Sequence, residues 1–120
     1  VSSGLVKLGR PGYGAYAASK HAVLGMVKCF ALELAAKNIR VNAVCPGWVD
    51  TEMAARDLEI TARETGKTVE QARNTATAGI PLKRFVTAEE VASLISWLLS
   101  DEASAVTGQS YNISCVEFTL

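Results

Sequence analysis

The stretch YGAYAASKHAVLGMVKCFALELAAKNIRVNAVCPG, residues 13–47, carries the pattern that decides the fold of this chain. From about Ala15 to Lys37 the apolar residues recur at alternating spacings of three and four, which predicts a helix with one buried face. Asn38 suits the left-handed conformation that commonly ends such a helix. Residues 39–47 are rich in β-branched side chains and stop at a Pro-Gly pair, so we expect a buried strand there.

Two further helical regions follow this strand. Residues 51–79 are rich in charged residues and alanine and are interrupted by Gly66, which favours two short helices. Within them, TVEQ at 68–71 has the spacing of a capping box. A second capping box, TAEE at 87–90, predicts the start of a strong helix that continues through Leu99.

Both ends of the chain carry short strand signals. SYNIS at 110–114 indicates a last strand, and residues 1–3 suggest the end of another strand before a glycine-rich loop over 4–14. The resulting order of strand, helix, strand, helices, helix and strand is typical of an α/β domain with a parallel sheet. We therefore expect three strands with flanking helices.

Several side chains that could do chemistry have an ordinary structural interpretation. We expect His21 on the surface or at an interface, Asn42 as a buried polar residue with its hydrogen bonds satisfied, and Cys45 as a small buried hydrophobe. The apolar residues near the end of the last helix are expected in the core: Leu94, Ile95, Trp97, Leu98 and Leu99.

The composition describes a globular chain without a strong charge bias. Among 120 residues, 12 are Lys or Arg and 12 are Asp or Glu, which argues against nucleic acid or an anionic membrane as a partner. No apolar run approaches the roughly 20 residues of a membrane span. The three cysteines form no C-x-x-C pair, which favours a reducing, cytoplasmic compartment and no metal site. The chain opens on VSSG without a signal-peptide pattern, and we expect it to be part of a longer protein.

Tyr16 and Lys20 stand four residues apart and therefore lie on one helical face, whereas Tyr13 has Ala17 at that distance. The pair could simply be a polar first turn of the helix. However, Ser2-Ser3 and the segment 45–51 both stand at predicted strand ends, and the carboxyl ends of parallel strands meet at one edge where ligands bind. A nearby cation stabilises the phenolate form of a tyrosine, so this edge is a candidate site for acid–base chemistry.

Three stretches, YAASK, NIRVNAVCPGWVDTEM and LLSDEASAVTGQ, resemble the patterns of the short-chain dehydrogenase/reductase family. The resemblance covers nearly all of the chain and implies the carboxy-terminal half of a doubly wound, Rossmann-like domain. It implies hydride transfer between NAD or NADP and a small carbonyl or alcohol substrate. It also implies a homo-oligomer, either a dimer or a tetramer.

The resemblance assigns roles residue by residue. Tyr16 would be the acid/base and Lys20 its activator, and this pair would also contact the cofactor. Ser3 would polarise the substrate, because the serine of the family lies thirteen positions before its tyrosine. Four residues would line the nicotinamide ring: Pro46, Gly47, Val49 and Thr51.

Residues 52–79 follow the nicotinamide-facing turn and are placed to close over the substrate as a mobile helical lid. The segment is highly charged, and its helices are too short to be stable without packing. We expect Met53, Ala54 and Leu58 to face the substrate.

Two departures from the family pattern bear on function. The glycine-rich G-x-x-x-G-x-G turn that holds the pyrophosphate does not occur in the sequence, and Cys115-Val116 follows the last strand where the family usually has Gly-Gly. We therefore expect this chain to be one part of an NAD(P)-dependent oxidoreductase and to be inactive by itself. The alternative is a catalytically inactive chain that serves as an interaction module.

Overall fold

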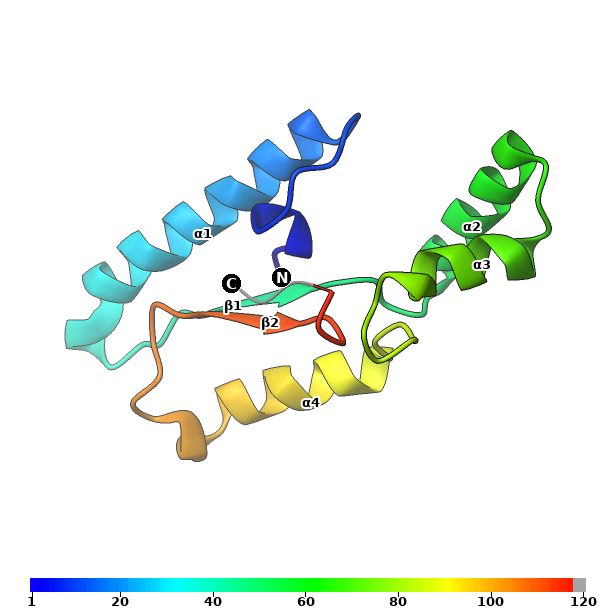
Figure 1. Ribbon diagram of the computed structural model, residues 1–120. Coiled ribbons are helices and arrows are strands. Elements are labelled where there is room, and N and C mark those ends of the chain that lie inside the picture. Colours follow the sequence, from blue (N-terminus) through cyan, green and yellow to red (C-terminus); the bar gives the residue numbers. More distant parts are fainter. Residues whose placement is uncertain (118–120) are drawn as a thin grey trace.

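The computed structural model describes residues 1–117 and shows an α/β arrangement of helices around a small sheet (Figure 1). Four α-helices and two strands occur within that range. In chain order they are α1 (Gly14–Leu34), β1 (Ala43–Pro46), α2 (Glu52–Thr65), α3 (Val69–Ala78), α4 (Ala88–Leu99) and β2 (Ser110–Ile113). Three short 3₁₀ turns accompany them: η1 (Gly4–Val6), η2 (Ala35–Lys37) and η3 (Asp101–Ala103).

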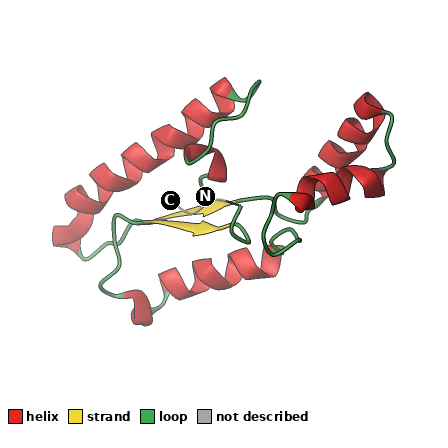
Figure 2. Cartoon of the chain, viewed as in Figure 1, coloured by secondary structure: helices red, strands yellow, loops and turns green. Residues whose placement is uncertain are grey.

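The two strands pair in parallel, with Ala43 opposite Ser110 and Pro46 opposite Ile113. Helix α1 lies on one side of this sheet and α4 on the other, while the α2–α3 pair stands beyond the carboxyl end of β1 (Figures 1 and 2). All four residues of β1 are buried, because helices and β2 surround the strand. This parallel α/β arrangement confirms the fold class expected from the sequence.

The expected first strand is not a strand in the structure. Residues 1–3 lie beside β1, and the Ser2 N–H donates to the Val44 carbonyl at 2.8 Å. The Ser3 hydroxyl then caps η1 by accepting from the Leu5 N–H, which turns the chain away after one ladder bond. The described part of the chain therefore contains two strands, not three.

Strand β1 is also shorter than the 39–47 expected from the sequence. Before Ala43, side-chain hydrogen bonds help to join the chain to residues 106–109. The Val41 N–H donates to the Thr107 hydroxyl, the Asn42 amide donates to the Val106 carbonyl, and the Asn42 oxygen accepts from the Gln109 N–H. Asn42 is thus half-buried with both amide ends bonded, as expected. His21 is exposed and Cys45 is fully buried, also as expected.

Arg40 ties the end of α4 to the start of β1. Its guanidinium donates to the carbonyl oxygens of Leu98, Ser100 and Ala103 at 2.7–3.1 Å. A cation at a helix carboxyl terminus satisfies orphan carbonyls and opposes the negative end of the helix dipole. This contact joins segments about sixty residues apart in the sequence.

Helices α2 and α3 form a hairpin with a small core of their own. Thr51 caps α2, Gly66 ends it in the left-handed conformation (φ 66°), and Thr68 and Gln71 form the expected capping box at the start of α3. Trp48 stacks on Phe85 at 5.2 Å between ring centroids and borders this core. The buried residues of the cluster are Leu58, Ala62, Ala72, Ile80 and Phe85.

The expectation of an apolar core at the end of α4 is wrong for two residues. Leu98 is buried and Leu94 and Ile95 are partly buried, but Trp97 is 37% exposed and Leu99 78% exposed. Periodicity marks the apolar positions of a helix without saying which of them a neighbour covers. The Trp97 ring meets the Tyr111 ring edge-on at 6.1 Å, and this contact covers Trp97 only in part. Within residues 1–117, no helix combines the length and apolarity needed to cross a membrane.

The capping box of α4 gives a stability test. The Thr87 hydroxyl accepts from the Glu90 N–H, and the Glu90 carboxylate accepts from the Thr87 N–H. We expect Thr87→Ala to lower the free energy of unfolding by about 1 kcal/mol, because the cap is lost. The control is Thr75→Ala in α3, whose hydroxyl bonds only within its own helix and should change stability little. Urea denaturation followed by circular dichroism measures both, and an equal effect of the two variants would contradict the capping argument.

Candidate active site

A cavity of about 330 Å³ opens at the carboxyl end of β1. It forms where η1, the first turn of α1, the β1–α2 turn and the start of α2 meet. This is the sheet edge at which ligands bind in parallel α/β proteins. Eight of the residues singled out from the sequence line it: Ser3, Tyr16, Pro46, Gly47, Val49, Thr51, Met53 and Ala54.

Two of the expected site residues lie elsewhere. Lys20 is not among the residues that line the cavity, although its ammonium lies beside the Tyr16 ring. Leu58 is buried in the core of the α2–α3 hairpin, one helical turn beyond Ala54, and does not face this cavity. Its apolar side chain packs against the facing helix, and that packing accounts for the difference from the expected substrate contact.

Tyr16 and Lys20 are close enough to interact. The Lys20 ammonium lies 5.5 Å from the centroid of the Tyr16 ring and donates to the Val1 carbonyl at 3.3 Å. Tyr16 is 46% exposed, on the cavity side of α1. Tyr13 contacts it edge-on at 6.5 Å, and Tyr13 lies under the Arg10 guanidinium instead of a lysine.

The two serines before η1 have different surroundings. The buried Ser2 hydroxyl donates to the Lys20 carbonyl at 3.0 Å and so fixes the chain terminus against α1. The Ser3 hydroxyl lines the cavity and accepts from the Leu5 N–H at 3.2 Å. A hydroxyl that accepts in this way keeps its own O–H as a donor for another group.

The β1–α2 turn forms the opposite wall. Gly47 donates its N–H to the Ile113 carbonyl, and a Cβ built on Gly47 would lie 2.9 Å from the Ser114 Cβ. Trp48 donates its N–H to the Glu117 carboxylate at 3.2 Å. Burial raises the pKa of Glu117, although this hydrogen bond and the charge of Arg10 oppose that effect.

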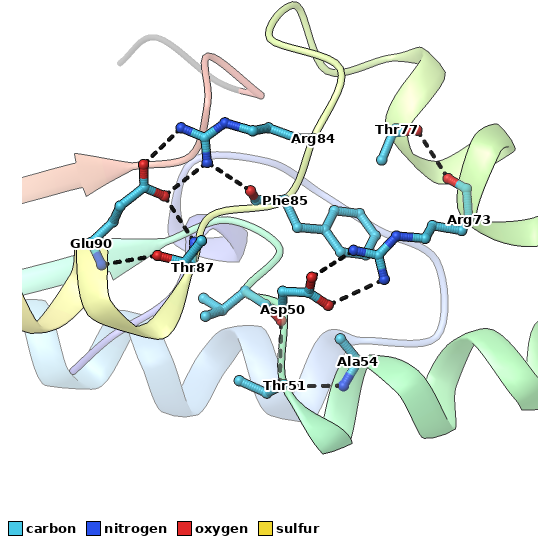
Figure 3. Close-up of polar contacts among 10 residues, drawn as sticks. Asp50, Thr51, Ala54, Arg73, Thr77, Arg84, Phe85, Thr87 and Glu90 are labelled. Atoms are coloured by element: carbon cyan, nitrogen blue, oxygen red, sulfur yellow. Dashed lines mark hydrogen bonds and ion pairs between the residues drawn. The ribbon is translucent and has the colours of Figure 1, made fainter. Parts of the chain in front are cut away.

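An ion pair fixes this wall to the α2–α3 hairpin (Figure 3). The Arg73 guanidinium donates two hydrogen bonds to the Asp50 carboxylate, at 2.6 and 3.1 Å. It also lies over the Phe85 ring, 4.8 Å from the ring centroid. The hydrogen bond from Arg73 lowers the pKa of Asp50. A second ion pair joins Arg84, which precedes Phe85, to Glu90 in α4. The hydrogen bonds from Arg84 and the Thr87 backbone lower the pKa of Glu90 to about 2.

Three charged residues that the sequence reasoning did not select also line the cavity: Arg10, Asp57 and Glu117. Glu117 follows the Cys115-Val116 departure, and that departure was the one available signal for it. Within residues 1–117, no group of three or more His, Cys, Asp or Glu side chains is arranged to hold a metal ion.

A family model described as "Enoyl-(Acyl carrier protein) reductase" matches residues 1–115 of this chain. One solved structure, from Francisella tularensis, is described as a short chain dehydrogenase family protein. It superposes with a TM-score of 0.91 at 35% identity, over 95% of this chain and 47% of that one. The chain belongs to the short-chain dehydrogenase/reductase family.

Other members of the short-chain dehydrogenase/reductase family are similar over comparable lengths. The 3-oxoacyl-[acyl-carrier-protein] reductase of Thermotoga maritima is 50% identical over 113 residues, which is 94% of this chain and 42% of that protein. The actinorhodin polyketide ketoreductase, solved with NADPH, has a TM-score of 0.87 at 42% identity, over 94% of this chain and 43% of that one. This chain thus spans less than half the length of the relatives it matches.

Gly47 provides a test of how closely the cavity wall is packed. We expect Gly47→Ala to lower the free energy of unfolding by roughly 1–3 kcal/mol, because the added methyl group collides with Ser114 and Glu117. Gly79→Ala is the matched control: its φ is −79° and its Cβ meets nothing, so it should be neutral or stabilise by up to about 1 kcal/mol. Thermal unfolding compares the two, and a harmless Gly47→Ala would show that the wall is not closely packed.

Proposed function

We propose that the protein carrying this chain is an NAD(P)-dependent oxidoreductase that interconverts a carbonyl compound and a secondary alcohol. One observation carries the proposal: Tyr16 and Ser3 face the same cavity as the Pro46–Thr51 wall, with the Lys20 ammonium beside the Tyr16 ring. Two of the relatives named above, the Thermotoga maritima protein and the actinorhodin ketoreductase, are reductases, which supports the same class of reaction.

The cavity suits part of the cofactor. Its volume of about 330 Å³ is at the small end of ligand pockets, which is enough for a ring and a small carbonyl group but not for a whole dinucleotide. The absence of a side chain at Gly47 lets Ser114 and the Glu117 carboxylate pack against the backbone of this wall. When bound, NAD or NADP supplies or accepts the hydride.

Tyr16 and Ser3 act on the substrate oxygen. A carbonyl that receives hydride becomes an alkoxide, and the Tyr16 phenol donates its proton to that oxygen. The Ser3 hydroxyl donates a hydrogen bond to the same oxygen and stabilises the charge that develops there. In alcohol oxidation the Tyr16 phenolate takes the hydroxyl proton back.

Lys20 supports this proton transfer through electrostatics. Its ammonium lies near the Tyr16 ring, and a cation at that distance stabilises the phenolate that remains after the proton has left. Its further N–H donors are available to ribose hydroxyls of the cofactor. We further propose that the protein is cytoplasmic and forms a homodimer or homotetramer. Its substrate is proposed to be a small molecule.

One observation favours the alternative of an interaction module. Met26 and Phe30 on α1, and Trp97 and Leu99 on α4, are exposed apolar side chains. Such surfaces mark contacts with another chain or with further residues of the same protein. Binding of NAD⁺ or NADP⁺ by the protein decides between the two, because the interaction module requires neither.

The catalytic assignment is tested by two tyrosine variants. We expect Tyr16→Phe to reduce kcat by at least about 100-fold while cofactor affinity stays nearly unchanged, because only the proton donor is lost. Tyr13→Phe is the matched control, on the same helix turn and in edge contact with Tyr16, and should retain most activity. Lys20→Ala should lower both kcat and cofactor affinity. An inactive Tyr13→Phe beside an active Tyr16→Phe would reverse the assignment.

The lid proposal for residues 52–79 is tested by hydrogen exchange. Met53 and Ala54 line the cavity at the first turn of α2, so we expect amides in this segment to gain protection when cofactor and substrate bind. The hairpin core around Leu58 and the Asp50–Arg73 pair oppose free motion, so the hairpin should move as a unit. Protection that is high without ligands and unchanged by them would leave the segment as fixed scaffold.

A further inference from the structure

Glu117 reaches from the end of the described chain back into the candidate active site. Its side chain is half-buried and lines the cavity together with Tyr16 and Trp48. Its Oε2 accepts from the Trp48 N–H at 3.2 Å. A backbone N–H in the cavity wall is a donor that a ligand could use, and here a side chain of the protein holds it.

The space over Gly47 makes this approach possible. A Cβ built on Gly47 would collide with the Glu117 carboxylate and with Ser114. The carboxylate therefore occupies the place that a side chain at position 47 would take. It lies against the wall at which the proposed function places a ligand ring.

The turn that carries Glu117 is strained. The Glu117 N–H donates to the Ser114 carbonyl at 3.0 Å, and the two residues between them have positive φ, 52° at Cys115 and 68° at Val116. This left-handed region is unfavourable for a β-branched residue, and glycine would adopt it freely. Strained turns of this kind persist only while the surrounding contacts hold them.

Burial also disfavours the charged form of Glu117. Burial raises its pKa, since the ionised carboxylate has lost water in the cavity. Arg10 faces it with the opposite charge, whereas Asp57 and the phenols of Tyr13 and Tyr16 line the same cavity without neutralising it. A strained turn and a partly desolvated carboxylate together favour release once another acceptor arrives.

We propose that Glu117 is a displaceable partner of the Trp48 N–H, which an uncharged oxygen acceptor of a ligand, such as a carboxamide or carbonyl oxygen, replaces on binding. Glu117 thereby sets the affinity of the site, because every such ligand competes with it. This inference rests on the proposed function for the identity of the ligand.

Two substitutions at position 117 separate this role from a structural one. In the protein that carries this chain, Glu117→Ala removes the competitor, so NAD⁺ or NADP⁺ should bind several-fold more tightly in titration calorimetry. Glu117→Gln keeps an acceptor for the Trp48 N–H without the cost of burying a charge, so it should hold the wall more firmly and weaken binding. Opposite shifts of Kd are the expected result. An unchanged or weaker affinity in Glu117→Ala overturns the inference.

Amide exchange of Trp48 provides a readout that needs no ligand. Removal of the acceptor in Glu117→Ala should speed hydrogen exchange at the Trp48 N–H, and Glu117→Gln should keep it slow. If neither cofactor binds to any variant, the proposed function fails, but faster exchange in Glu117→Ala still supports the contact. Equal exchange rates in wild type and Glu117→Ala overturn it whatever the cofactor does.

Discussion

The burial of β1 is the constraint on which the rest of the structure depends. Four residues of strand have helices on both faces and β2 along one edge, so their backbone groups must pair and their side chains must be small or apolar. The direction of this strand then fixes where the chain emerges, at Pro46 and Gly47. The cavity stands there because α1 brings Tyr16 to the same end.

The α2–α3 hairpin reaches that cavity as a unit with its own core. Trp48 belongs to both parts, since its ring stacks on Phe85 while its backbone N–H lies in the cavity wall. The Asp50–Arg73 pair links the same wall to α3. Movement of the hairpin would therefore displace the Pro46–Thr51 turn, where the proposed function places the cofactor ring.

Local signals in the sequence predicted local features well. The two capping boxes, the left-handed Asn38 and the parallel pairing of residues 110–113 all appear in the structure, because each depends on neighbours in sequence or on strand pattern. Most of the site residues selected from the sequence line the cavity, although other residues line it as well. The coverage of apolar side chains was harder to predict: Trp97 and Leu99 are apolar positions of α4, but their exposure depends on what packs against each of them. Leu58 was misplaced for the same reason, since a helix position does not say which neighbour it meets.

The Arg40 contact also has a consequence for how the chain acquires its fold. Arg40 and its acceptors are separated by 58 to 66 positions, and β1 pairs with a strand that is equally distant along the chain. Such long-range contacts form slowly, because a large loop must close before they can stabilise anything. During synthesis on the ribosome, β1 emerges several seconds, on the order of 3–12, before β2 exists. An apolar strand with an open edge is prone to aggregation in that interval.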